Sequence, residues 1–275
     1  KSIKCTKKIL IANKESIICG WNLINKELKK YKTNFIPVDS EHFSIWYALK
    51  NNKVKNIDKI YLTASGGPFL KKSTKKIQLA DALNHPSWKM GKKISIDSAT
   101  MMNKVFEIIE AKNIFNLPIS KLKILTHPKS YLHAIIKFKN GLSNMIVHET
   151  DMKIPIFNSI YENKKYYKKI EKLNLNKFNK LNLKKPDLKK FPLIKILQKI
   201  PKKFSLYETI LVSTNDTLVE LFLKNKINFI SIPKVFETLI NIKEFKKYRN
   251  KVPTKIDQII KLNKLVQFNI KSMYN

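Results

Sequence analysis

Residues 8–38 read KILIANKESIICGWNLINKELKKYKTNFIPV and indicate the fold class of the chain. Lys8–Ala12 and Phe35–Val38 are short apolar runs with the character of buried strands, and the stretch around Trp21–Leu28 has helical spacing. The polar residues 13–15 are expected to form a turn between the first strand and the helix. A strand, a helix and a second strand in this order are typical of a parallel, doubly wound sheet, so we expect an α/β protein.

Further elements follow along the chain. We expect strands at Ile60–Thr63 and Ile94–Ile96, a helix that begins at Asp97 or Ser98, and a hairpin of Leu132–Phe138 and Leu142–Val147 around Asn140-Gly141. Beyond a stretch rich in Lys, Asn and Leu, apolar residues recur at helical spacing from Leu206 and again from Ile256. The carboxyl end is therefore predicted to be helical.

The formal net charge of +35 raises nucleic acid as a possible partner. However, Arg249 is the single arginine, and arginine is the residue that reads phosphates and bases with two hydrogen bonds. The lysines are spread along the chain among Asn and Ile, whose codons are also rich in A and T. We interpret the charge as a consequence of base composition, and nucleic-acid binding stays an alternative.

Cysteine usage and hydrophobicity bear on the compartment in which the protein works. Cys5 and Cys19 have no metal-type spacing and form no disulfide framework, which fits a reducing compartment. No apolar run reaches membrane-spanning length, since Lys195 interrupts even residues 191–197. The first residue is Lys1, so we expect the true amino terminus, with any targeting signal, to lie upstream. We expect a cytoplasmic protein, or an organelle stromal one if a transit peptide precedes it.

Acidic residues are rare in this chain, and two of them follow the second predicted strand directly. Asp39 and Glu41 are two positions apart, so in extended conformation both carboxylates would face the same side. The carboxyl ends of parallel strands are where open α/β sheets bind ligands. Oxygen ligands suit Mg²⁺ or Mn²⁺ rather than zinc. Turns also use acidic residues freely, so a solvated turn remains the alternative.

A second group of polar residues lies in Ser95–Glu110, which reads SIDSATMMNKVFEIIE. Asn103, Lys104 and Glu107 fall on one helical face. Ser98 at the expected helix start, with Lys104 nearby, is a natural phosphate site, and Glu107 could supply a third carboxylate to the metal. The alternative is an amphipathic helix with a solvated face, but the rest of this helix is largely apolar.

A third element is the segment His85–Gly91, in which Trp88 is a candidate lid residue. Trp88 could equally anchor the loop to the core. His127 and His133 sit in an apolar stretch and are predicted to be structural, while His42 and His148 carry no clear signal.

Several segments together indicate a known family. They are ANKES (12–16), PVDSEH (37–42), SGGPF (65–69), HPSWKMGKKISIDSATMMNK (85–104) and TDMKIPI (150–156). In order and spacing they resemble the 1-deoxy-D-xylulose 5-phosphate reductoisomerases, strongly from about Lys8 to Pro155 and weakly beyond. A run as long as residues 90–104 is far more specific than any short motif.

The resemblance implies a role for each matching residue. It implies Asp39, Glu41 and Glu107 as Mg²⁺ or Mn²⁺ ligands. The residues implied to bind substrate are Lys14, Ser40, Glu41, Ser65, His85, Ser98, Asn103, Lys104 and Glu107, with Lys14, Glu41, His85, Lys104 and Glu107 as the catalytic ones. Asn13, Glu15, Gly91 and Met90 would contact NADPH, and Trp88 would belong to the lid.

The resemblance also implies a reaction and a domain layout. The reaction is the metal- and NADPH-dependent isomerisation and reduction of 1-deoxy-D-xylulose 5-phosphate to 2-C-methyl-D-erythritol 4-phosphate, in isoprenoid precursor synthesis, by a homodimer. We expect the end of a Rossmann-like NADPH-binding domain in residues 1–39, a catalytic domain with a partly antiparallel sheet in 40–161, a linker in 162–187 and a helical domain in 188–275. A relative with the same metal and phosphosugar site but another substrate, or without reductase activity, is an alternative.

The chain departs from the family pattern in four places. The glycine-rich nucleotide-binding turn is absent from it, so we expect the 275 residues alone to be inactive in hydride transfer. Val105 stands where the family usually has Gly. Residues 147–149 are atypical, and residues 212–216 only loosely match the family's Asn-Ala-Ala-Asn-Glu.

Overall fold

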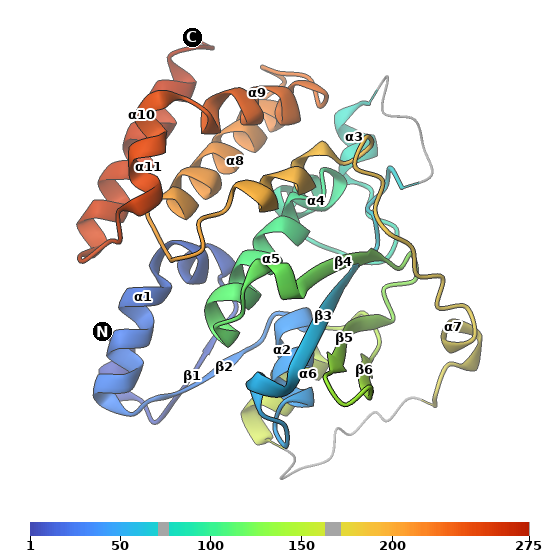
Figure 1. Ribbon diagram of the computed structural model, residues 1–275. Coiled ribbons are helices and arrows are strands. Elements are labelled where there is room, and N and C mark those ends of the chain that lie inside the picture. Colours follow the sequence, from blue (N-terminus) through green and yellow to red (C-terminus); the bar gives the residue numbers. More distant parts are fainter. Residues whose placement is uncertain (71–76, 163–171, 275) are drawn as a thin grey trace.

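The computed structural model describes residues 1–70, 77–162 and 172–274 (Figure 1). Strand β1 (Lys8–Ile11) pairs in parallel with β2 (Asn34–Pro37), and helix α1 (Lys14–Tyr31) connects them, so the predicted strand–helix–strand unit is confirmed. The predicted turn at residues 13–15 is wrong in part. Asn13 caps α1 by accepting a hydrogen bond from the Ser16 amide at 2.8 Å, and Lys14 and Glu15 already lie in the first helical turn.

The second sheet is mixed and has four strands. Its strands are β3 (Ile57–Ala64), β4 (Leu122–Thr126), β5 (Leu132–Phe138) and β6 (Ser143–Val147), in the order β4-β3-β5-β6. Strands β3 and β4 are parallel, whereas β5 is antiparallel to both β3 and β6. The predicted strand at Ile60–Thr63, the hairpin around Asn140-Gly141 and the partly antiparallel sheet are confirmed.

Two helices separated by a sharp break lead into the core. Helix α4 (Lys92–Ala99) ends just before Met101, which has a left-handed backbone (φ +63°), and α5 (Met102–Phe115) begins directly after it. The predicted strand at Ile94–Ile96 is therefore wrong, as is the predicted helix start at Asp97 or Ser98. Ile94 and Ile96 lie within α4, where residues two apart point to nearly opposite sides of the helix, so Ile94 is exposed and Ile96 is fully buried.

Helix α5 is nearly all buried and packs against α1, α2 (Ser40–Ala48), α4, β3 and β4. The carboxyl-terminal helices α8 (Tyr207–Leu223), α9 (Ser231–Ile240), α10 (Lys243–Lys246) and α11 (Ile256–Lys271) gather at one end of the molecule (Figure 1). The predicted helical character of this region is confirmed. Helix α8 contacts α1 and α4, and a buried ion pair of 2.9 Å between Lys112 of α5 and Glu208 of α8 fastens it to the core.

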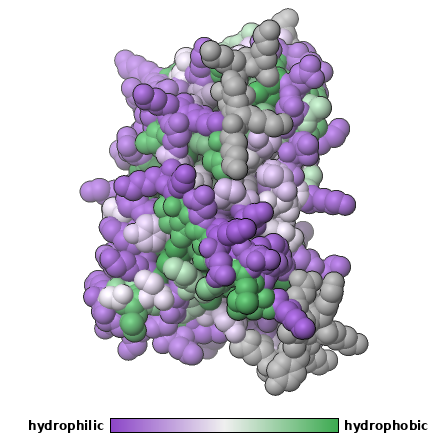
Figure 2. Space-filling view, turned by 90° about the vertical axis from the view of Figure 1, so that its right-hand side faces the viewer, coloured by the Kyte–Doolittle hydropathy of each residue, from purple (hydrophilic) through white to green (hydrophobic). Residues whose placement is uncertain are grey.

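The remaining elements are short. They are α3 (Leu79–Leu83), α6 (Lys153–Tyr161), α7 (Leu175–Phe178) and the 3-10 segments Ser2–Cys5, Val54–Asn56, Ile119–Lys121, Pro192–Lys199 and Lys247–Asn250. Part of the predicted linker, residues 163–171, lies outside the described residues. Within the described ranges, no helix is long and apolar enough to cross a membrane. Figure 2 shows one face on which hydrophilic residues predominate, with hydrophobic patches between them.

Candidate functional site

A cavity of about 360 Å³ lies where the ends of β1 and β3 meet the starts of α2 and α5. Its wall is formed by Ala12, Lys14, Asp39, Ser40, Glu41, Thr63, Ala64, Ser65, His85, Trp88, Lys89, Met90, Gly91, Ile94, Ser98, Met101, Asn103, Lys104, Glu107, Ser130, Leu132, His133 and Met152. The cavity thus brings together segments from residue 12 to residue 152. All nine residues predicted to bind substrate line it.

Three carboxylates converge in this cavity. Ligand atoms of Asp39, Glu41 and Glu107 all lie within 4.8 Å of one another. The predicted convergence of the first two is observed, but the expected extended conformation is wrong. Asp39 caps α2, its Oδ1 accepting from the Ser40 amide at 3.0 Å, and Glu41 lies in the first helical turn. The helix start, rather than a strand, turns both side chains toward Glu107 of α5.

Two buried lysines balance this negative charge. Lys104 Nζ lies 2.6 Å from Glu41 Oε1 and 2.5 Å from Glu107 Oε2, while Lys14 Nζ lies 3.2 Å from Asp39 Oδ2. Burial opposes the charge on Lys14, but the neighbouring Asp39 and Glu107 outweigh it and raise the pKa of Lys14 well above its ordinary value. Both lysines therefore remain cationic at neutral pH.

The carboxylates respond differently to the same surroundings. Burial alone would raise the pKa of Asp39, yet the Lys14 ammonium overcomes it and the pKa is lowered. For Glu107, burial and the adjacent Glu41 carboxylate raise the pKa. Asn103 fixes the Glu107 side chain: its amide donates to Glu107 Oε1 at 2.5 Å, and its carbonyl accepts from Lys14 at 2.6 Å.

A hydroxyl–imidazole pair lies at another wall of the cavity. His85 Nδ1 accepts hydrogen bonds from the Ser87 and Trp88 amides at 3.2 and 3.0 Å, so its proton is on Nε2, which donates to Ser65 Oγ at 2.9 Å. Burial lowers the pKa of His85 to about 4, which keeps the ring neutral. Ser65 Oγ also accepts from the Gly67 amide at 3.0 Å. With both lone pairs in use, the Ser65 hydroxyl can donate its hydrogen to a ligand.

Ser98 reaches the cavity in an unexpected way. It lies in the last turn of α4, not at a helix start, so the dipole argument made for it from the sequence does not hold. The break at Met101 lets Ser98 of α4 and Asn103 and Lys104 of α5 line one cavity. A straight helix across residues 98–104 would spread these side chains around its circumference.

The segment of the predicted lid also lines the cavity. Trp88, Met90 and Gly91 all contribute to its wall. Trp88 meets the ring of His133 edge to face at 6.3 Å between centroids, and His133 stacks on His148 at 3.7 Å. His133, predicted to be structural, is therefore also a cavity residue, which its apolar sequence context did not indicate.

Asn13 and Glu15, two residues predicted to bind the cofactor, do not line the cavity. Glu15 instead joins an ion-pair cluster centred on Lys93. The Lys93 ammonium lies 2.6 Å from Glu15, 3.1 Å from Asp97 and 3.1 Å from Asp216 of α8. This cluster, which we call the Lys93 junction, ties α1, α4 and α8 together beside the cavity.

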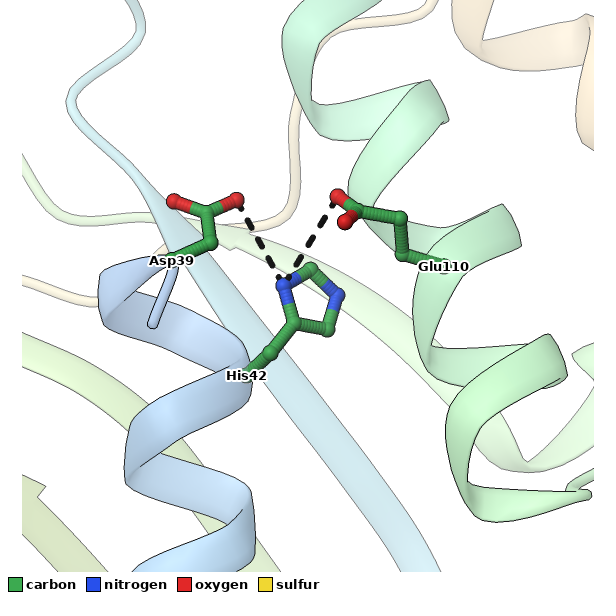
Figure 3. A group of neighbouring side chains, drawn as sticks. All are labelled: Asp39, His42 and Glu110. Atoms are coloured by element: carbon green, nitrogen blue, oxygen red, sulfur yellow. Dashed lines mark ion pairs between the residues drawn. The ribbon is translucent and has the colours of Figure 1, made fainter. Parts of the chain in front are cut away.

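Sequence reasoning missed two buried residues behind the carboxylates, His42 and Glu110. His42 Nδ1 points between Asp39 and Glu110 (Figure 3). Burial opposes a charge on His42, but Glu110 and Asp39 raise the pKa of its ring to about 9, while burial raises the pKa of Glu110 to about 8. Each is three positions from a predicted ligand, a spacing that shares one helical face and could have indicated them.

An α/β fold whose cavity gathers three carboxylates close enough to share one ion is typical of metal-dependent enzymes. Two family models match the chain: the 1-deoxy-D-xylulose 5-phosphate reductoisomerase C-terminal domain over residues 35–115, and the DXP reductoisomerase C-terminal domain over residues 148–267. The chain belongs to the 1-deoxy-D-xylulose 5-phosphate reductoisomerase family. The resemblance and the enzyme class predicted from the sequence are confirmed.

Individual relatives agree with this assignment. The chain is 61% identical over 274 residues to the reductoisomerase of Pelagibacter ubique (strain HTCC1062), covering 98% of this chain and 71% of that protein. It is 40% identical over 278 residues to that of Clostridium tetani (strain Massachusetts / E88), covering 100% of this chain and 71% of that protein.

Solved structures of the family superpose closely. A DOX-P reductoisomerase in complex with NADPH, fosmidomycin and magnesium matches with a TM-score of 0.90 at 30% identity, over 98% of this chain and 71% of that one. The reductoisomerase from Zymomonas mobilis in complex with NADPH matches with a TM-score of 0.88 at 28% identity, over 100% and 70%.

Proposed function

We propose that this protein carries out the metal- and NADPH-dependent isomerisation and reduction of 1-deoxy-D-xylulose 5-phosphate to 2-C-methyl-D-erythritol 4-phosphate. One observation carries the proposal: in a chain of this family, the three carboxylates and the Ser65–His85 pair open into one cavity. A relative is solved with NADPH, fosmidomycin and magnesium, which supports a metal, a nicotinamide cofactor and a phosphorylated substrate here.

The metal ligands would be Asp39, Glu41 and Glu107. Their oxygens are close enough to share one ion, and an oxygen-only set suits Mg²⁺ or Mn²⁺. Such an ion would polarise the ketose oxygens and stabilise negative charge that develops on them. The chain's part is to hold the carboxylates. Asn103 fixes Glu107, and Lys104 fixes Glu41.

The phosphate would bind at the side of Ser65, Ser98, Asn103 and Lys104. The Ser65 hydroxyl can donate its hydrogen to the phosphate. His85 is held in the tautomer whose Nε2 donates to Ser65 Oγ, so the serine does not need to donate to the ring. Lys104 supplies a positive charge between phosphate and carboxylates. Lys14 and Ser40 would lie by the reacting oxygens, where the Lys14 ammonium can donate to them.

NADPH would approach from the side of Met90 and Gly91, with Trp88 as the lid residue. We propose that β1, α1 and β2 are the end of a Rossmann-like cofactor domain, with Asn13 and Glu15 at its edge. NADPH supplies the hydride, and the residues of this chain orient the substrate to receive it. The division into domains at residues 39, 161 and 187, homodimer formation, a cytoplasmic or stromal location and the inactivity of the 275 residues alone all stay predictions.

Titration of the chain with fosmidomycin by calorimetry tests this function. Binding should be saturable with Mn²⁺ present and at least tenfold weaker after chelation of the metal, because the drug would share the ion with three carboxylates. An affinity for fosmidomycin that is the same with and without Mn²⁺ would contradict the proposal. A phosphosugar enzyme with another substrate would bind other sugar phosphates more tightly than 1-deoxy-D-xylulose 5-phosphate in the same assay.

A further inference from the structure

His42 and Glu110 lie next to the candidate metal ligands, but neither lines the cavity. His42 is fully buried and belongs to the same first turns of α2 as Asp39 and Glu41. Glu110 is 1% exposed and lies one turn after Glu107 on α5. The two residues therefore belong to the two helices that supply the carboxylates.

The His42 ring joins these helices through both of its nitrogens. Nε2 lies 2.9 Å from the backbone oxygen of Glu107. A carbonyl oxygen only accepts, so Nε2 carries a hydrogen and donates it. Nδ1 lies 3.4 Å from Asp39 Oδ2 and 3.7 Å from Glu110 Oε2, as Figure 3 shows. One ring thus touches the backbone of one candidate ligand and the carboxylate of another.

Glu110 has few other partners. Within the described residues, Glu110 Oε2 is buried and forms no hydrogen bond, and its ion pair is the one with His42. Asp39, by contrast, also has Lys14 and the Ser40 amide. The charges of Lys14, Asp39 and Glu107 also act on the Glu110 carboxylate, but His42 is the group it pairs with, so Glu110 can affect the position of Asp39 mainly through that ring.

We infer that Glu110 is a positioning residue that acts through His42 and sets the distance between Asp39 and Glu107. Residues that hold metal ligands from behind typically change metal affinity by about 10–100-fold when they are replaced. Without the Glu110 carboxylate, the ring loses one of the two groups that fix its Nδ1 edge. Asp39 then keeps Lys14 and the Ser40 amide as partners, but the ring no longer fixes its distance from Glu107. This inference rests on the metal site of the proposed function.

The test is an Mn²⁺ titration followed by the electron paramagnetic resonance signal of the free ion, which needs neither substrate nor NADPH. Glu110→Gln should bind Mn²⁺ roughly tenfold or more weakly than the unmodified chain. His42→Gln keeps a donor near the position of Nε2 but removes the link to Glu110. In the double variant, Glu110→Gln should cause no further loss of Mn²⁺ affinity, because the His42 ring through which Glu110 acts on Asp39 has already been removed.

Glu208→Gln is the matched control, since it also removes a fully buried carboxylate, one that pairs with Lys112 and does not line the cavity. It should lower the melting temperature and leave Mn²⁺ affinity unchanged. An Mn²⁺ affinity of Glu110→Gln within about twofold of the unmodified chain would overturn the inference. Additive losses in the double variant, or an equal loss in the control, would also overturn it.

The outcomes separate this inference from the proposed function. If the unmodified chain binds no Mn²⁺, the metal site itself fails and the inference fails with it. If that chain binds Mn²⁺ and Glu110→Gln binds it equally well, only the positioning role fails. Should Glu110→Gln not fold, Glu110→Asp retracts the carboxylate from His42 and is judged by the same comparisons.

Discussion

The backbone oxygen of Ser98 lies 2.8 Å from the point where a Cβ would stand on Gly67, whose φ is +64°. The loop after β3 therefore rests directly on the end of α4. This contact places Ser65 and Ser98, from loop and helix, on one wall of the cavity. No side chain fits between the two backbones, and the backbone conformation of Gly67 is one that other residues rarely adopt.

We expect Gly67→Ala to push Ser98 out of place and to weaken fosmidomycin binding by about tenfold, a loss of about 1.4 kcal/mol. The melting temperature should also fall, because the added methyl group must displace backbone rather than a flexible side chain. Calorimetry and thermal unfolding measure the two effects. Gly20→Ala is the control, since its Cβ would meet only Ile259 Cδ1 at 3.9 Å. A helical Gly→Ala should stabilise by roughly 0.5–1 kcal/mol. Unchanged drug binding in Gly67→Ala would contradict the argument.

Asp39→Asn and Glu107→Gln should each weaken Mn²⁺ binding strongly, because each removes a charged oxygen ligand from a site built of three. The unmodified chain should bind one Mn²⁺. Asp187→Asn, in the region after α7, is the control and should leave the affinity unchanged. Equal affinity in Glu107→Gln and the unmodified chain would remove Glu107 from the ligand set.

The free energy of unfolding should depend on pH through the buried carboxyl group of Asp216. Burial raises its pKa from 3.8 to about 6, although Lys93 acts in the opposite sense. A carboxyl group whose pKa is higher in the folded state binds protons more readily there, so it makes unfolding more costly as pH falls from about 6 toward 3.8. Asp216→Asn should therefore be more stable than the unmodified chain at pH 7, with the difference shrinking toward pH 4.5. Urea unfolding at several pH values measures this, and a difference independent of pH would refute it.

The lysine excess predicts weak binding to random duplex DNA at physiological salt, without preference for any sequence, because isolated lysines contact phosphates as point charges. Fluorescence anisotropy with two unrelated duplexes at two salt concentrations measures this. A sub-micromolar complex that distinguishes the two duplexes would favour the nucleic-acid alternative.

The sequence predicted those parts of the fold that have local signals. Residues 8–38 carry two apolar runs around a helix, and Asn140-Gly141 marks the hairpin, so both were found. Ile94–Ile96 was misjudged because three residues are too few to distinguish the period of a strand from that of a helix. Gly91, the residue before α4, is extended, and the helical pattern begins only after it.

The same limit applies to the site. Asp39, Glu41 and Glu107 could be named because acidic residues are rare here and their segments resemble a family. The spacing of three residues places His42 near Asp39 and Glu110 near Glu107, but the joint role of His42 and Glu110 depends on how α2 packs against α5. No spacing within one segment reveals a contact between residues 42 and 110. The position of Ser98 beside Lys104 likewise depends on the left-handed backbone of Met101. Methionine rarely adopts this conformation, so the sequence does not indicate the break between α4 and α5.

The Lys93 junction limits how this protein can be recombined with its relatives. A chimera joined between α7 and α8 would take Lys93 and Asp97 from one parent and Asp216 from the other. If the second parent lacks an amide at position 215, the buried Asp97 carboxylate loses the hydrogen bond of 2.7 Å that it accepts from Asn215 of α8. The carboxyl-terminal helices are thus not an interchangeable module, and an engineer who exchanges them must keep residues 97 and 215 as a pair.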